Sequence, residues 1–262
     1  MMTDMATAKQ LDGLFLVYLT SAVQFGFIAG TLLFAILAFA DRYSPSLVFL
    51  FSALMAAFFN GLVTLDWMGA NEILIARFFT GFFLAGIYPV GMKIAADYFE
   101  KGLGKSLGFL VGALVLGTAF PHLIKFFSFS FDWEYIFYAT SFLSVLGGLL
   151  LFVFVKDGPY RRQLGQVNLT AIKEVVSLPL LRQAAFGYFG HMWELYAFWT
   201  FVPMMLALKL KEDNFNISLL SFLIIGIGSI ACAISGLLSV QLGAKQMAKV
   251  SVAISAICCL TF

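Results

Sequence analysis

The segment GHMWELYAFW, residues 190–199, places two ionisable side chains inside an otherwise apolar run, 184–208. On an α-helix His191 and Glu194 lie about 60° apart, and Tyr188 flanks His191 on its other side. Histidine titrates near neutral pH and burial pushes a carboxylate towards the same range, so the pair suits proton coupling. The strip equally suits a cationic or hydroxylated solute between aromatic walls, and a structural hydrogen bond is the third alternative.

A second charge, Arg77, lies in the apolar run 73–96. A charged side chain at the centre of a membrane helix costs about 2.5–3.5 kcal/mol, so Arg77 requires a partner or a polar cavity. On an unbroken helix Leu84 and Tyr88 lie within about 20° of it. This face predicts a cation with a phenol below it, for substrate binding or proton coupling. The alternative is that Arg77 snorkels to the membrane surface.

The elements that must position these residues are membrane helices. The chain has 262 residues, 61% of them hydrophobic and only 11% charged, which is unlike a soluble domain. A helix needs about 20 apolar residues to cross a bilayer, so the apolar runs predict about seven full transmembrane helices and a partial one. We therefore expect an all-α, polytopic membrane helix bundle. The runs are 14–40, 46–65, 73–96, 107–126, 135–155, 184–208, 217–240 and a last one from about 247.

Composition also excludes several classes of function. The net charge of +2 is small and the basic residues are dispersed, so nucleic acid is not an expected partner. Cys232, Cys258 and Cys259 fall in apolar stretches without other ligands at suitable spacing, so we expect neither a metal site nor a disulfide. An intramembrane enzyme using His191 and Glu194 would lack a nucleophile. We expect no catalytic residues, no cofactor, and a lipid bilayer and a small solute as partners.

Loop charges predict the orientation of the chain. Most of the 16 lysines and arginines fall in alternate loops, which are therefore assigned to the cytoplasm. Met1 then lies outside, so we expect a further helix before it. The last run is too short for a full crossing. Together these two features predict that the sequence is an internal piece of a longer protein. The long break 156–183 predicts a cytoplasmic linker with a short interfacial helix capped by Asn168, or alternatively an unstructured loop.

Small residues recur at every fourth position in three of the runs. Such stripes let two helix backbones approach closely, so they predict a tight bundle rather than separate anchors. The stripes and the small residues that extend them are Ala22, Gly26, Gly30, Gly104, Gly108, Gly112, Gly117, Pro121, Gly228, Cys232 and Gly236.

Two cytoplasmic loops resemble each other and the loop between helices two and three of the major facilitator superfamily. LAFADRYSPS, residues 37–46, keeps the Ala-Asp-Arg of that signature, and GLLSVQLGAK, residues 236–245, keeps its glycines, a leucine and the final lysine. ARFFTGFFLAGIYPVGMK, residues 76–93, is similar to the fourth-helix signature. GALVLGTAFP, residues 112–121, is similar to the fifth-helix pattern.

This resemblance implies an incomplete major facilitator fold. Residues 1–155 would form the N-terminal half without helix one, 156–183 the central loop, and 184–262 the start of the C-terminal half. In that family helices one, four, seven and ten line the cavity, and two, five, eight and eleven form the interface between halves. The expected function is secondary transport of a small solute by alternating access, as a symporter or antiporter in a bacterial inner membrane.

The resemblance also implies roles for particular residues. Asp41 and Arg42 become gating candidates with Lys93 and Asp97 as their partners, unless they form an ordinary charged turn. The competing hypothesis is a truncated, non-transporting chain, inactive or active only in interactions. The candidates for substrate binding or proton coupling are Arg77, Tyr88, Tyr188, His191 and Glu194.

Overall fold

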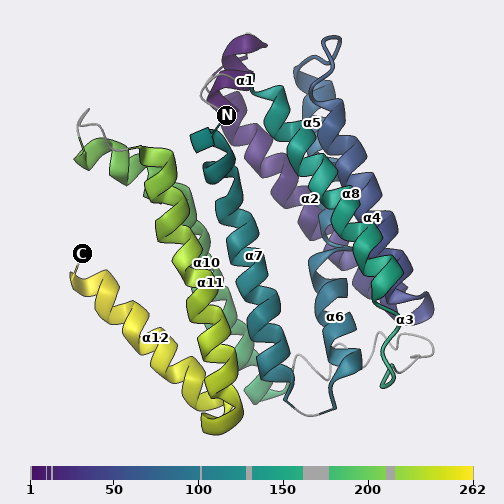
Figure 1. Cartoon of the computed structure of the whole chain (residues 1–262), viewed down its shortest axis with the longest axis vertical. Helices are drawn as coiled ribbons and strands as arrows, with labels where there is room; N and C mark the ends of the chain where they lie inside the picture. The colour runs from purple at the N-terminus through teal and green to yellow at the C-terminus, as the bar shows by residue number, and fades with distance from the viewer. Residues whose placement is uncertain are drawn as a thin grey trace. The chain divides into compact units, whose positions relative to one another are not determined.

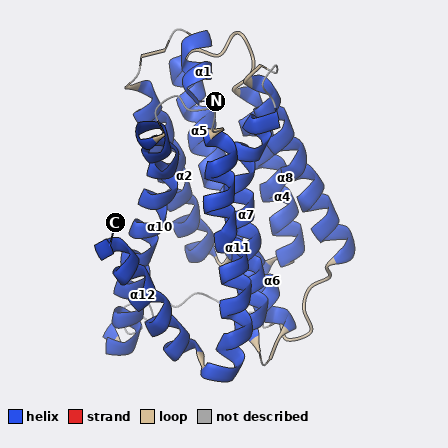
Figure 2. Cartoon of the chain, turned by 60° about the vertical axis from the view of Figure 1, so that its left-hand side comes forward, coloured by secondary structure: helices blue, strands red, loops and turns tan. Residues whose placement is uncertain are grey.

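The structure is a computed structural model that describes residues 2–9, 11–12, 14–100, 102–127, 132–161, 177–210 and 216–261. These residues form helices and connecting turns and contain no strand, which confirms the all-α prediction (Figure 1, Figure 2). The chain folds as two compact units. Unit 1 comprises Met1–Lys101 with Ser128–Val167, and unit 2 comprises Gly102–Phe127 with Asn168–Phe262.

Unit 1 is organised around α4, which packs against both α5 and α8, while α2 packs along α5. Its main apolar core lies at the end of the unit near α1, where Met5, Val63 and Ile73 are fully buried. The helices of this unit are α1 (Met2–Ala8), α2 (Phe15–Leu37), α3 (Phe39–Arg42), α4 (Pro45–Leu62), α5 (Ala70–Leu84), α6 (Tyr88–Tyr98) and α8 (Glu134–Phe154).

Unit 2 is organised around the pair formed by α7 and α11, with α10 and α12 packed on α11. A smaller apolar core of Val115, Ala119 and Ile225 lies between α7 and α11. The helices of this unit are α7 (Leu103–Phe127), α10 (Pro179–Lys209), α11 (Ile217–Leu242) and α12 (Ala244–Thr261).

Six stretches of the described residues are long and apolar enough to cross a membrane. The predicted run 184–208 is helical within α10 but is not among them, because His191, Glu194 and the surrounding tyrosines and tryptophans lower its mean hydropathy. The six stretches are Phe15–Ile36, Pro45–Leu62, Ala70–Tyr98, Leu103–Phe127, Glu134–Phe154 and Ile217–Leu242.

The helix predicted over 73–96 is interrupted between α5 and α6. Residues 85–87 form turns, and Pro89 opens α6. A proline inside a helix has no N–H to donate to the carbonyl four residues earlier, and its ring collides with that carbonyl. The break separates Arg77 from Tyr88, so the prediction that both lie on one unbroken helical face is wrong.

In unit 1 the small residues of α2 pack against the backbone of α5. A Cβ atom added to Gly26 would collide with the carbonyl of Phe78, and one on Gly30 would lie 3.0 Å from the Cβ of Ala85. In the opposite direction, a Cβ on Gly81 of α5 would collide with the carbonyl of Val23. Glycine is required at these positions because two backbones meet there with no room for a side chain.

In unit 2 glycines likewise let the backbones of α7 and α11 pack closely together. A Cβ atom on Gly108 would lie 2.6 Å from the Cα of Gly236, and one on Gly236 would lie 2.8 Å from the Cα of Gly108. A Cβ on Gly112 would lie 2.9 Å from the carbonyl oxygen of Ser229. The contact therefore brings two glycines face to face, so neither helix can carry a side chain there without moving apart.

Two other members of the predicted stripes lie against side chains rather than backbone. A Cβ on Gly104 would collide with the Ser239 hydroxyl, and one on Gly228 would lie 3.2 Å from a methyl group of Val115. At Gly117 it would meet no described atom within 4 Å, so this glycine makes no close helix contact within the described part of the chain. Helix α7 continues through Pro121 to Phe127.

The compact units follow packing, whereas the predicted boundaries 1–155, 156–183 and 184–262 follow the halves of the family fold. Helix α7 belongs to the predicted first half but packs on α11 and so falls in unit 2. Most of the predicted interfacial helix lies in residues 162–176, outside the described residues. The division into halves and a linker therefore stays a prediction.

Candidate functional site

The predicted gating residues Asp41, Lys93 and Asp97 form one charged cluster between α3 and α6. The Lys93 ammonium lies 2.9 Å from a carboxylate oxygen of Asp41 and 3.5 Å from one of Asp97. Asp97 is buried, and its other carboxylate oxygen has no hydrogen-bond partner within the described residues. Arg42 is exposed and forms no ion pair with any described residue. One lysine therefore bridges two acids from separate helices.

Replacing Lys93 by methionine is expected to destabilise unit 1, because it leaves Asp41 and the buried Asp97 without their shared cation. Hydrogen bonds to charged groups contribute about 1.5–3 kcal/mol, and we expect a loss in this range. The measurement is thermal unfolding of the detergent-solubilised protein. The control is Lys105→Met, because Lys105 is exposed and forms no ion pair with a described residue. Equal midpoints for the two variants would contradict the bridge.

Residues after α8 hold the turn between α3 and α4, which sequence reasoning did not find. The Asp157 carboxylate accepts hydrogen bonds from Ser44 at 2.8 Å and Ser46 at 3.2 Å, at the N-terminus of α4, where a negative charge is favourable. Arg161 pairs with Asp157 at 2.6 Å and donates to the carbonyl of Tyr43 at 2.6 Å. The available signal was an acid and an arginine four residues apart, directly after the run 135–155.

Arg77 is buried, with 4% of its surface exposed, so it does not snorkel. Its Nη1 donates to the Oδ1 of Asn60 on α4 at 3.0 Å, and its guanidinium lies 4.6 Å from the centre of the Phe137 ring on α8. Asn60 is held in turn by the hydroxyls of Thr140 and Ser141. Arg77 thus joins α4, α5 and α8, and its described contacts do not include Tyr88.

Three of the predicted site residues, Tyr188, His191 and Glu194, belong to α10, and Glu194 contacts α12. The Nδ1 of His191 lies 3.9 Å from one oxygen of Glu194, whose other oxygen accepts a hydrogen bond from the Ser255 hydroxyl. The thiol of Cys259 lies 3.4 Å from that same oxygen. Tyr188 packs its ring against that of Phe189. A carboxylate in a largely apolar helix therefore has three polar groups within 4 Å of its oxygens.

Sequence reasoning missed Ser255 and considered Cys259 as a metal ligand or disulfide partner, both of which it excluded. Both lie on the same side of α12 because they are four residues apart, but no local pattern links them to a carboxylate more than 60 positions earlier in the chain. The predicted site residues also fall in different units. Arg77 and Tyr88 belong to unit 1, and Tyr188, His191 and Glu194 belong to unit 2.

Comparison with known families agrees with the loop and helix signatures. The family model of the Major Facilitator Superfamily matches residues 1–262. No curated protein and no solved structure matches the chain. The six apolar stretches of an all-helical chain fit a protein that crosses the membrane several times. Because the match spans the sequence, the chain belongs to the major facilitator superfamily, a family of multi-pass membrane transporters of small solutes rather than of enzymes.

Proposed function

We propose that this protein is a secondary transporter working by alternating access, in which Glu194 couples movement of a small solute to protons. The observation that carries the proposal is the environment of this carboxylate. His191 on α10 and the Ser255 hydroxyl and Cys259 thiol on α12 all approach it. These groups can donate hydrogen bonds to an ionised carboxylate, and an imidazole can pass a proton on through its second ring nitrogen.

The geometry supports a link between proton binding and a helix contact. An ionised Glu194 offers acceptor sites to Ser255 and Cys259, and it attracts a protonated His191. Protonation removes the charge and weakens these hydrogen bonds, since bonds to charged groups are roughly twice as strong as neutral ones. A proton on Glu194 would therefore weaken the hydrogen bonds between α10 and α12. The two helices could then move relative to each other, as alternating access requires.

The cluster of Asp41, Lys93 and Asp97 supports a second role, that of a gate which opens and closes during the transport cycle. The ion pair between Lys93 and Asp41 fastens α6 to α3, and a second pair, between Lys93 and Asp97, lies within α6. Separation of α3 from α6 would have to break the first pair. Arg77 is left out of the coupling site because its contacts are with α4 and α8. Tyr88 and Tyr188 stay predicted solute contacts.

The test is transport by the Glu194→Gln variant, which keeps the size of the side chain but cannot ionise. Allosteric coupling energies are about 1–3 kcal/mol, so we expect stimulation of uptake by an inward proton gradient to fall at least about fivefold. Exchange of solute at equal pH on both sides is expected to continue. The measurement uses protein expressed from its complete native gene in proteoliposomes, with labelled amino acids, hexoses and short-chain carboxylates screened first.

The matched control is Glu100→Gln, because Glu100 is exposed after the end of α6 and its charge change is identical. It should respond to the proton gradient like the unmodified protein. Undiminished gradient-driven uptake by Glu194→Gln would exclude this carboxylate from coupling. Uptake no greater than in empty vesicles for all three solute classes would favour the non-transporting alternative.

A further inference from the structure

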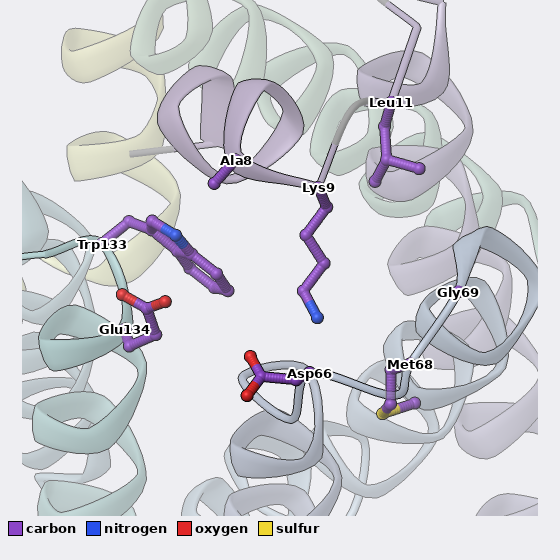
Figure 3. Close-up of a pocket in the computed structure, with 8 residues that line it drawn as sticks. All are labelled: Ala8, Lys9, Leu11, Asp66, Met68, Gly69, Trp133 and Glu134. Carbon is purple, nitrogen blue, oxygen red and sulfur yellow. The ribbon is translucent and has the colours of Figure 1, made fainter.

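A cavity of about 220 Å³ lies in unit 1 where α1, the connection from α4 to α5, and the start of α8 meet (Figure 3). Lys9, Asp66, Trp133 and Glu134 supply its polar and aromatic lining. Figure 3 shows the Lys9 side chain and the Trp133 ring reaching towards the same space, with the two carboxylates around it. The cavity shares no residue with the coupling site on α10 or with the cluster around Lys93.

The three charges around this cavity are not paired with one another, since no ion pair within 4.0 Å joins them. The Lys9 ammonium donates to the carbonyl of Leu65 at 2.6 Å, which leaves two of its three N–H groups without a described partner. Asp66 accepts no hydrogen bond from a described residue. One oxygen of Glu134 is buried and has no described partner either. The positive charge of Lys9 and the negative charges of Asp66 and Glu134 therefore line the same cavity without pairing.

The walls of the cavity are fixed by the core below them. Met5 of α1 is fully buried in the cluster that includes Phe137, and its carbonyl accepts a hydrogen bond from the backbone N–H of Lys9 at 2.9 Å. The Trp133 ring packs edge-on against Phe137, with the ring centres 5.5 Å apart. A site whose groups are held before the ligand arrives loses less entropy on binding.

We propose that this cavity binds a small zwitterion carrying one ammonium and one carboxylate, such as an α-amino acid. The carboxylate of the ligand would meet the spare N–H groups of Lys9. Its ammonium would lie between Asp66 and Glu134, against the face of Trp133, which attracts cations. Each unpaired charge of the lining then gains an opposite charge, and the partly buried Glu134 is neutralised.

The dimensions and composition of the cavity favour this class of ligand. A single water needs only about 10–15 Å³ of such space, so a volume of about 220 Å³ leaves room for a molecule as small as alanine. Two carboxylates line it, and no group of three or more His, Cys, Asp or Glu suitable for a metal occurs among the described residues. A bare metal cation would also leave the Lys9 ammonium facing a like charge.

The experiment is calorimetric titration of the detergent-solubilised, unmodified protein with L-alanine, ethylammonium and propionate. The last two ligands each lack one charged group of alanine. We expect saturable alanine binding, and binding at least about tenfold weaker for each of the other two, because a lost hydrogen bond to a charged group costs about 1.5–3 kcal/mol. Emission from Trp133, in a variant with the other tryptophans replaced by phenylalanine, reports the same event at the site.

Single variants then assign the binding to the cavity. Lys9→Met and Glu134→Gln should each weaken alanine binding at least about tenfold. The control is Glu72→Gln, because Glu72 is an exposed acid in the first turn of α5 and does not line the cavity. It should bind alanine like the unmodified protein. Absence of saturable alanine binding, or ethylammonium and propionate binding as tightly as alanine, would overturn the proposal. Binding needs no transport, so this result is independent of the test on Glu194.

Discussion

Replacing Gly108 by leucine is expected to disrupt unit 2, because it forces α7 away from α11. A Cβ atom there would already lie 2.6 Å from the Cα of Gly236 and 2.9 Å from the carbonyl oxygen of Cys232. Backbone atoms cannot rotate away as side-chain ends can, so α7 and α11 would have to separate. Overpacking costs about 1–3 kcal/mol, and we expect a loss of about 3 kcal/mol because the obstacle is backbone.

The measurement is thermal unfolding together with the elution profile of the purified protein. A loss of about 3 kcal/mol corresponds to a midpoint lowered by about 6–12 °C in a chain of this size. The matched control is Gly117→Leu in the same helix, where a Cβ atom would meet no described atom within 4 Å. A Gly108→Leu protein that melts with the Gly117→Leu protein would show that α7 and α11 are not in this contact.

The glycine contacts illustrate what the sequence can predict. Spacing by four places Gly104, Gly108 and Gly112 on one face of a helix, and the same holds for Gly228 and Gly236, so close packing of these helices follows from geometry alone. The choice of partner does not follow. Nothing in the local pattern pairs α2 with α5, because the fit of two glycine faces depends on which helices the rest of the fold brings together.

The break between α5 and α6 shows the opposite case. Pro89 was visible in the sequence, but a proline within a hydrophobic run of membrane length is often accommodated by neighbouring helices. Pro121 in α7 is an example, because that helix continues through it. The two prolines differ in their tertiary surroundings, which a single sequence does not reveal; at Gly86, within the break, an added Cβ atom would collide with the Ser52 hydroxyl.

Only part of the candidate site could be predicted from the sequence. Lys93 and Asp97 are one helical turn apart, and the resemblance of the loop to a family signature brought in Asp41, so this cluster could be proposed from residue order. The side chain of Arg77 could not be placed, because periodicity gives the face of a helix but not which neighbour covers it. Ser255 and Glu194 meet across a long stretch of chain that carries no pattern linking them.

Replacing Asn60 by leucine is expected to destabilise unit 1 about as much as Gly108→Leu destabilises unit 2. The substitution leaves the buried Arg77 without its hydrogen-bond acceptor. Nη1 of Arg77 donates to Asn60, while Nε and Nη2 have no partner among the described residues. Leaving a buried polar group without its hydrogen-bond partner costs about 1–3 kcal/mol, and more when that group is charged, so we expect a loss of about 3 kcal/mol. Ser141→Ala is the control, since it removes one of the hydrogen-bond acceptors of Asn60 without altering the guanidinium; we expect it to cost about 1 kcal/mol.

The double variant Asn60→Leu/Arg77→Met separates the charge from the lost packing. If the damage comes from an uncompensated guanidinium, removing that charge should recover most of the free energy of unfolding, because an apolar pair of similar volume is stable in place of a buried polar one. The measurement is a double-mutant cycle of unfolding free energies. A double variant no more stable than Asn60→Leu alone would show that Asn60 acts through Thr140, Ser141 and the backbone of α8. Recovery would instead make Arg77 a charge that unit 1 tolerates only through Asn60, and transport that survives in the double variant would then show that solute movement does not need this guanidinium.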